Sequence, residues 1–161
     1  MVLGSDGTIA IIGRAYYDGS NYGIHLTKLT QAEGGIVLSR VYHYTNIDGR
    51  FAGLTPDPSG GLIIHGRGKI PPSTQFKALV FKVDDSGDVQ WSTNLDDNIA
   101  GDELIYIGGT KVTSTGDIIV VGYLGKPSSA SSDTFLAKLN GSGQLHWMRS
   151  YGFPSNDFKS F

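Results

Sequence analysis

The chain has 161 residues, a formal net charge of −2 and no cysteine. This length suits one domain with a real core, the charge provides no general basic field for a nucleic-acid backbone, and the lack of cysteine excludes disulfides, zinc–thiolate sites and cysteine nucleophiles. The 23 glycines and eight tyrosines are typical of a β-protein with many turns, and no apolar run in the sequence approaches the roughly 18 residues of a membrane span.

Short apolar runs, each followed by a glycine, recur three times along the chain. They lie at residues 9–12, 62–64 and 118–121, and the glycines that follow are Gly13, Gly66 and Gly122. The runs are rich in β-branched residues and too short for a helix, so they predict strands buried on both faces. The glycine spacing gives a repeat of about 53 to 56 residues, within the range of propeller blades and β-solenoids.

A second and a third strand follow each of these runs. The second strands are predicted at 24–29, 78–83 and 134–139, and the third at 36–40, 89–93 and 145–149. Gly- and Asx-containing segments between them predict hairpin turns. Each second strand carries one lysine. We expect the lysine to cover the outward side of its strand, with its aliphatic stem packed on neighbouring residues. Two of the third strands carry a tryptophan, which we expect to anchor packing between units. These residues are Lys28, Lys82, Lys138, Trp91 and Trp147, with Leu38 in place of the first tryptophan.

A fourth, less regular strand is predicted at 50–55, 104–109 and 157–161. The sequence therefore predicts a single all-β segment over 1–161 made of three four-stranded antiparallel units. Their approximate bounds are 5–49, 50–101 and 102–156, followed by a closing strand at 157–161.

The repeat resembles the blades of a large bacterial and phage β-propeller-repeat family. The third unit, where Gly122 is followed by Asp133-Thr134-Phe135-Leu136-Ala137-Lys138-Leu139-Asn140-Gly141-Ser142-Gly143-Gln144-Leu145-His146-Trp147, carries the strongest likeness. The second unit is less similar and the first least, because it has Leu38 in place of the tryptophan and a turn one residue longer. The resemblance covers nearly the whole chain and implies a propeller fold, but propellers host binding, assembly and catalysis alike.

The predicted strand order leaves the first and last strands offset. The opening unit is expected to lack its innermost strand, and residues 157–161 are expected to supply one without a partner in the same chain. Three blades cannot close a ring, because propellers need roughly four to eight. One hypothesis is that two copies associate head to tail, each completing the first blade of the other in a six-bladed ring. The alternatives are a piece of a larger propeller and a monomeric open arc.

Two sets of connections leave opposite ends of the predicted sheets. One set is short and tight. The other is longer and more varied, and we expect binding residues there because loops on a rigid scaffold carry function. Aromatic planes beside polar groups suit sugar rings, whereas the alternative is that the tyrosines pack between units or border a protein interface. The candidate ligand-binding residues of this loop-rich face are Tyr16, Tyr17, Tyr42, Tyr44, Asp48, Asp102, Tyr123 and Tyr151.

Acidic residues precede the predicted fourth strands at Asp48, Asp102 and Asp157. They indicate either a ring of cation ligands or Asx-turns that start each strand, and we favour the Asx-turns. The four histidines lack the spacing of a metal site, and no nucleophile elbow, phosphate loop or dinucleotide motif occurs in the sequence. The sequence therefore predicts no metal, no cofactor and no enzyme activity. Acid pairs that meet across units leave a hydrolase or lyase as a third, less favoured class.

The function expected from these features is a non-enzymatic binding or structural module. Its expected partners are other copies of itself, through blade completion, and a surface glycan or a virion or cell-surface protein. No nucleic acid is expected as a partner. The family resemblance implies a virion or the outside of a cell as its setting, although no signal peptide is visible at the start of the sequence. A carbohydrate-binding, lectin-like propeller is the alternative.

Overall fold

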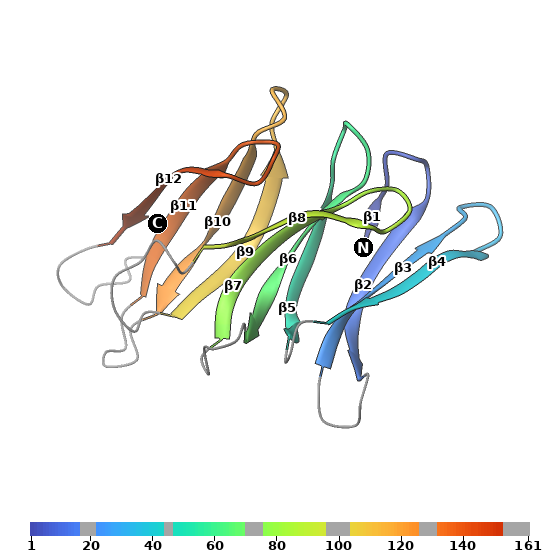
Figure 1. Ribbon diagram of the computed structural model, residues 1–161, viewed down its shortest axis with the longest axis horizontal. Coiled ribbons are helices and arrows are strands. Elements are labelled where there is room, and N and C mark those ends of the chain that lie inside the picture. The colour runs from blue at the N-terminus through green and yellow to red at the C-terminus, as the bar shows by residue number, and fades with distance from the viewer. Residues whose placement is uncertain (17–21, 44–46, 70–75, 96–103, 126–131, 153–161) are drawn as a thin grey trace, which may run out of the picture.

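The computed structural model describes residues 1–16, 22–43, 47–69, 76–95, 104–125 and 132–152, with the backbone alone at 47–52, 69, 76 and 104. These residues form three four-stranded antiparallel sheets (Figure 1), and they contain no helix, so none that is long and apolar enough to span a membrane. The strands are β1 (Val2–Leu3), β2 (Ile9–Tyr16), β3 (Tyr22–Leu29), β4 (Ile36–Tyr42), β5 (Ile47–Pro56), β6 (Leu62–Lys69), β7 (Phe76–Val83), β8 (Val89–Asn94), β9 (Leu104–Val112), β10 (Ile118–Gly125), β11 (Ser132–Leu139) and β12 (Leu145–Tyr151).

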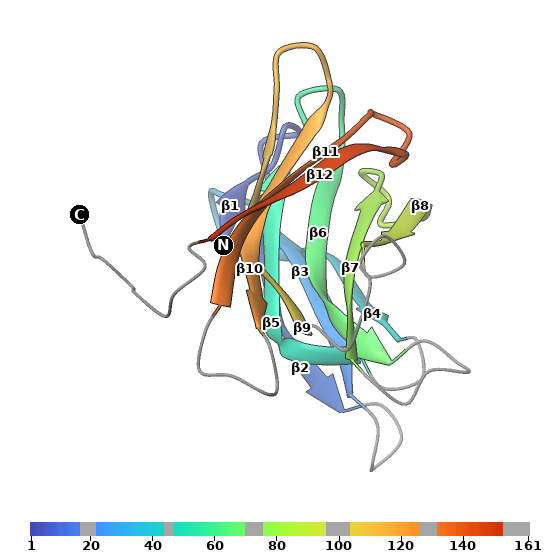
Figure 2. The same ribbon diagram turned by 90° about the vertical axis from the view of Figure 1, so that its left-hand side faces the viewer.

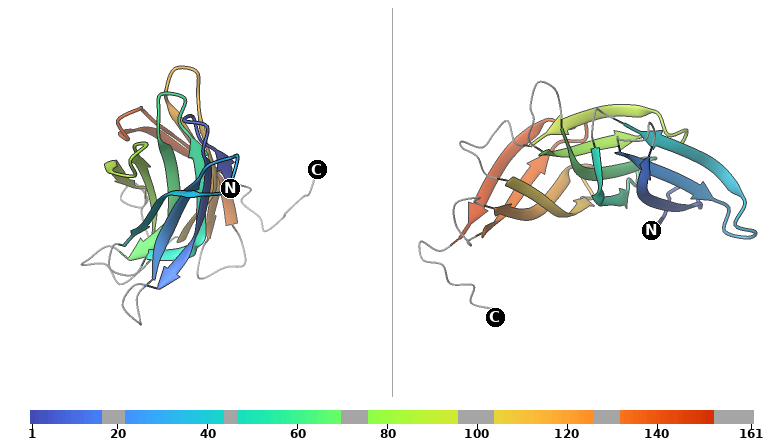
Figure 3. Two further views of the ribbon diagram at one scale, coloured as in Figure 1. Left: turned by 90° about the vertical axis from the view of Figure 1, so that its right-hand side faces the viewer. Right: turned by 90° about the horizontal axis from the view of Figure 1, so that it is seen from below.

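The all-β class and the three antiparallel units are confirmed. In each sheet the strands pair in chain order, from β1 to β4, from β5 to β8 and from β9 to β12. Seen from below, the three sheets follow one another along a curved array (Figure 3). Tight turns of all three sheets lie at the same end of the strands, toward the top of the view in Figure 2. The closing strand predicted at 157–161 lies outside the described residues.

The first sheet already has four strands, because β1 pairs with β2, so the prediction that the opening unit lacks its first strand is wrong. In β1, Val2 pairs with Ala10 and Leu3 pairs with Ile9. The reason is local: the Gly4 amide donates to the Thr8 carbonyl at 2.7 Å and folds the chain back onto β2. Because β1 has two residues and β2 has eight, the edge of β2 that faces β1 is unpaired over 11–16 among the described residues.

Two hydrophobic clusters join the sheets. One lies between the first and second sheets and includes Leu26 and Ile64, and the other lies between the second and third sheets and includes Ile63 and Phe135. Successive side chains of a strand point to opposite faces, so the neighbours Ile63 and Ile64 serve different clusters. The middle sheet is therefore the layer on which both others pack.

Burial on both faces, predicted for all three apolar runs, is correct only for the middle one. Leu62, Ile63 and Ile64 are at most 1% exposed. By contrast, Ile11 in the first sheet is 37% exposed and Val121 in the third is 41% exposed. Both side chains lie on the outer faces of the array, on which no sheet of the described residues packs.

The recurring lysines point to the turns at the sheet ends, not to the outward side of their strands as predicted. Lys28 pairs with Asp6 at 2.5 Å, Lys82 with Asp57 at 2.7 Å, and Lys138 with Asp117 at 2.8 Å. The prediction is wrong because each acid belongs to the turn between the first two strands of its own sheet, next to the lysine-bearing strand. The side chain of Lys28 is only 3% exposed, whereas that of Lys138 is 30% exposed.

These ion pairs lower the pKa values of the three acids. Burial raises the pKa of Asp6, but the bonds from Lys28 and Thr8 outweigh this and lower it to about 2. The pKa of Asp57 is lowered in the same way, with Lys82 overcoming the effect of burial. For Asp117, the bond from Lys138 is the main cause of a lowered pKa. In each sheet, one ion pair therefore connects the first turn to the lysine-bearing strand, which is β3, β7 or β11.

Candidate interaction surfaces

The predicted tyrosines fall within strands, not in the loops where the sequence placed them. Tyr16, Tyr42 and Tyr151 are the last residues of β2, β4 and β12, and Tyr123 lies inside β10. The strands extend farther than predicted because their ladders continue, for example to the pair of Tyr16 with Tyr22.

The remaining predicted site residues are less well placed. Asp48 lies inside β5, where its backbone pairs with Arg67, and not before the strand as predicted. Tyr17, Tyr44 and Asp102 lie outside the described residues, as does Asp157.

Tyr16 forms an exposed aromatic cluster with two residues that the sequence analysis did not propose. Its ring centroid lies 4.3 Å from that of Tyr22, and the two hydroxyl oxygens are 2.5 Å apart. The guanidinium carbon of Arg14 lies 3.1 Å from the Tyr22 centroid, an arrangement that favours a cation over the ring face. The hydrogen bond to Tyr22 raises the pKa of Tyr16. The signal in the sequence was the arginine after Gly13, which recurs after Gly66.

Tyr123 belongs to a second cluster, which joins two sheets. It stacks on Tyr106 with centroids 4.7 Å apart and an interplanar angle of 12°. The guanidinium carbon of Arg67, from the middle sheet, lies 4.9 Å from the Tyr106 centroid. Tyr123 keeps 45% of its surface exposed, so part of this cluster is accessible to solvent.

Tyr42 is an internal contact residue. It is 8% exposed, meets Phe81 edge-on at 5.3 Å and donates its hydroxyl hydrogen to the Gly87 carbonyl at 2.8 Å. Burial raises its pKa to about 12. Tyr42 therefore packs between the first two sheets, which was the alternative to ligand binding in the sequence-based prediction.

The same type of contact joins each pair of neighbouring sheets, and we call it the turn-on-strand contact. In the first, the β7–β8 turn sits on β4: the Gly87 carbonyl accepts hydrogen bonds from Arg40 and Tyr42, each at 2.8 Å. Arg40 also pairs with Asp88.

In the second turn-on-strand contact, the β11–β12 turn sits on β8. Trp91 Nε1 donates to the Gly141 carbonyl at 3.0 Å, and Thr93 Oγ1 donates to the Gly143 carbonyl at 2.5 Å. The predicted role of Trp91 as a packing anchor between units is confirmed, since it also packs on the cluster between the second and third sheets.

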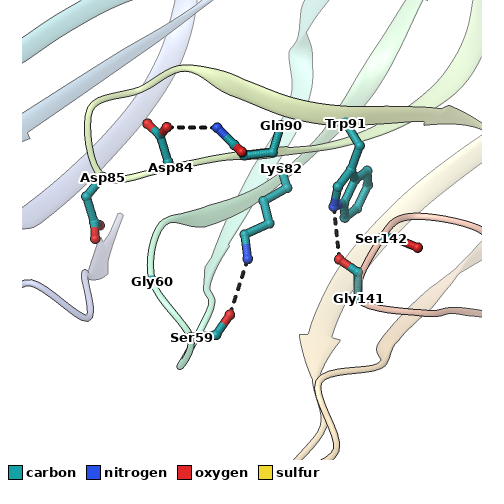
Figure 4. Close-up of a pocket in the computed structure, with 9 residues that line it drawn as sticks. All are labelled: Ser59, Gly60, Lys82, Asp84, Asp85, Gln90, Trp91, Gly141 and Ser142. Atoms are coloured by element: carbon teal, nitrogen blue, oxygen red, sulfur yellow. Dashed lines mark hydrogen bonds between the residues drawn. The ribbon is translucent and has the colours of Figure 1, made fainter.

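A cavity of about 470 Å³ lies beside this second contact (Figure 4). It sits at the tight-turn end, opposite the loop-rich end where the sequence placed the site. Inside it Gln90 donates to Asp84 at 2.8 Å and Lys82 donates to Ser59 at 3.2 Å. Its lining residues are Ser59, Gly60, Lys82, Asp84, Asp85, Gln90, Trp91, Gly141 and Ser142. Hydroxyl, amide and carboxylate groups next to an indole provide hydrogen bonds and an apolar plane for a hydroxyl-rich ligand.

Across the part of the chain that the structure describes, no group of three or more histidine or acidic side chains could hold a metal ion. No protein-family model and no curated protein sequence matches this chain.

Proposed function

We propose that this chain is a non-enzymatic interaction module whose three sheets are β-propeller blades, completed into a closed ring by another copy. The observation that carries the proposal is the repetition of the turn-on-strand contact at both internal interfaces, while no sheet among the described residues packs on the outer faces of the two end sheets. A contact of the same type that recurs between successive sheets of an array favours continuation of that array by a further unit.

The open faces carry apolar side chains of the kind that interfaces cover. Leu3 and Ile11 of the first sheet are 57% and 37% exposed, and Val121 and Trp147 of the third are 41% and 38% exposed. Apolar side chains exposed on the free face of a sheet favour association with another surface. Three blades are too few for a propeller, whereas two copies together supply six, within the range of roughly four to eight.

Light scattering on the purified chain tests this proposal. We expect a mass near twice the 17.2 kDa of one chain, held on dilution to low micromolar concentration because closing the ring covers both open faces at once. A mass of 17.2 kDa at every concentration would overturn it.

The setting that fits this role is a virion or cell surface, as the family resemblance implies. There the exposed clusters of Tyr16 with Tyr22 and of Tyr106 with Tyr123 would contact a partner protein or glycan. Tyrosine is well suited to this, because it offers a large rigid contact area together with a polar tip.

A second candidate function is carbohydrate binding, and the cavity beside Trp91 favours it. Gln90 and Ser142 offer polar groups on its wall, and neither side chain bonds to the neighbouring sheet in the turn-on-strand contact. We expect Gln90→Ala to weaken any glycan bound there by about tenfold, because a lost hydrogen bond in a binding site is worth roughly 1.4 kcal/mol. A glycan array probed with the wild-type chain and this variant measures it, and no binding at high protein concentration would eliminate the candidate.

A further inference from the structure

We infer that the outer face of β12 is an acceptor site for the β3–β4 turn of a second copy of this chain. The acceptor residues are Trp147, Arg149 and Tyr151, and the donor turn spans residues 30–35. The inference rests on the proposed function and adds to it the two surfaces that meet, which makes the contact between copies a third turn-on-strand contact.

The acceptor positions correspond to those that make the internal contacts. Leu38, Trp91 and Trp147 each pair across the ladder with the repeated lysine of the neighbouring strand. Two residues further along their strands stand Arg40, Thr93 and Arg149. Two further again stand Tyr42, Tyr151 and Leu95, which directly follows β8. Residues two apart in a strand share a face, so each trio presents one surface to the next sheet.

The first two trios are covered and the third is open. Tyr42 is 8% exposed and Leu95 is fully buried, whereas Tyr151 at the corresponding position is 53% exposed. Trp147 is 38% exposed. The open trio combines the donors used in both internal contacts, since it has the indole of the second and the arginine and tyrosine of the first. It can therefore donate to several turn carbonyls at once.

The donor turn is one residue longer than the two turns that are already docked, but like them it is closed by a glycine amide that donates to the first residue of the turn. Gly34, Gly87 and Gly143 occupy the same place in their turns and have φ values of 67°, 80° and 82°. A Cβ on Gly87 would meet Leu38 and the Tyr42 hydroxyl, and one on Gly143 would meet the Trp91 ring. At Gly34 nothing lies within 4 Å of that position, so this turn alone of the three is unoccupied by a neighbouring strand among the described residues.

Charge supports the same pairing. In the first internal contact Arg40 of the acceptor strand pairs with Asp88 beside the docked turn. On the open acceptor face the corresponding cation is Arg149, and the donor turn carries Glu33, both of them exposed. An arginine and a carboxylate brought together in this way add orientation to the contact.

The inferred contact is head to tail, because the acceptor and donor lie on opposite end sheets. Two copies close into a ring only if each gives its turn to the other, which produces two identical contacts. Mixing two differently damaged copies therefore restores one intact contact.

The test uses the whole chain with Gly34→Asn as the donor variant and Trp147→Ala as the acceptor variant. Gly116→Asn is the matched control, because Gly116 has a φ of 81° and, like Gly34, nothing within 4 Å of its Cβ position. Asparagine tolerates a positive φ, so both glycine variants are expected to fold. Thermal unfolding checks that each of the three variants is folded. We expect each of the two interface variants to raise the dissociation constant of the dimer at least tenfold in sedimentation, and the control to leave it unchanged.

An equimolar mixture of Gly34→Asn and Trp147→Ala is expected to regain heterodimers by native mass spectrometry. If the wild-type chain is dimeric and the variants leave its dissociation constant unchanged, or the mixture restores nothing, the assignment of these surfaces is wrong while the ring remains. If the wild-type chain is monomeric, the proposed function itself fails.

Discussion

Replacement of Gly61 by alanine is expected to lower the free energy of unfolding by about 2–5 kcal/mol. Gly61 has a φ of +78°, and a Cβ there would collide with the carbonyl oxygen of Val83 and approach Asp84 Cα within 2.9 Å. A left-handed conformation costs a residue with a Cβ about 1–2 kcal/mol, and overpacking against a neighbouring strand adds about 1–3 kcal/mol. Neither the turn nor the strand can yield easily, because the Gly61 amide donates to Asp85 Oδ1 at 3.1 Å.

Gly116→Ala is the control for this substitution. Gly116 has a φ of +81° in the corresponding turn of the third sheet, and nothing lies within 4 Å of its Cβ position. Its replacement is expected to cost only the conformational part, about 1–2 kcal/mol. Urea unfolding of both variants measures the difference, and equal losses would show that the close approach of Val83 contributes nothing.

Acidification from pH 6.5 to 4 is expected to remove about 3 kcal/mol of stability through His65 alone. His65 is 6% exposed, with Gly53 against its ring and the Thr110 hydroxyl 3.4 Å from Nδ1. Burial lowers its pKa from 6.5 to about 4. Below pH 6.5 the histidine is therefore protonated in the unfolded chain but stays neutral in the folded chain. Stability decreases as the pH is lowered, until the folded histidine is protonated as well.

His65→Val is expected to flatten this part of the stability profile, because it removes the imidazole that titrates. Valine is a suitable replacement, because the corresponding positions in the other sheets hold Ile12 and Val121. The measurement is urea unfolding at pH 7, 5.5 and 4.5. His146→Gln, at an exposed position of β12, controls for loss of a histidine as such. The paired acids act in a separate window: the lowered pKa of Asp6 keeps its contribution intact above 3.8, and it is lost as pH falls toward about 2. A profile for His65→Val as steep as the wild-type profile would refute the role of His65.

Local chemistry in the sequence was sufficient to predict the strands and tight turns. Glycines such as Gly34, Gly87 and Gly143 adopt positive φ values in the turns predicted for them, and β-branched runs between such turns form strands. These properties depend on residues close in sequence, so a single chain reveals them. The same reasoning could not predict that Val2 and Leu3 would fold back on β2, because two residues carry too little pattern.

The direction of the repeated lysines was decided by contacts distant in sequence. From the pattern alone, Lys28 was expected on the outward side of its strand. In the structure its ammonium pairs with Asp6, and Asp85 of the next sheet lies 3.5 Å away. Only the pairing of strands and the packing of sheets bring these groups together.

Trp91 and Trp147 mark the limit of what the sequence by itself determined. They occupy the same place in the repeat, and the sequence correctly indicated that both lie in the strand after the lysine-bearing one, which is β8 or β12, the last strand of its sheet. Tertiary structure alone decided their surroundings: Trp91 packs against the following sheet, whereas Trp147 stays 38% exposed. The physical reason is that the burial of a side chain depends on whether another sheet packs on its face. The sequence of one repeat unit does not determine this.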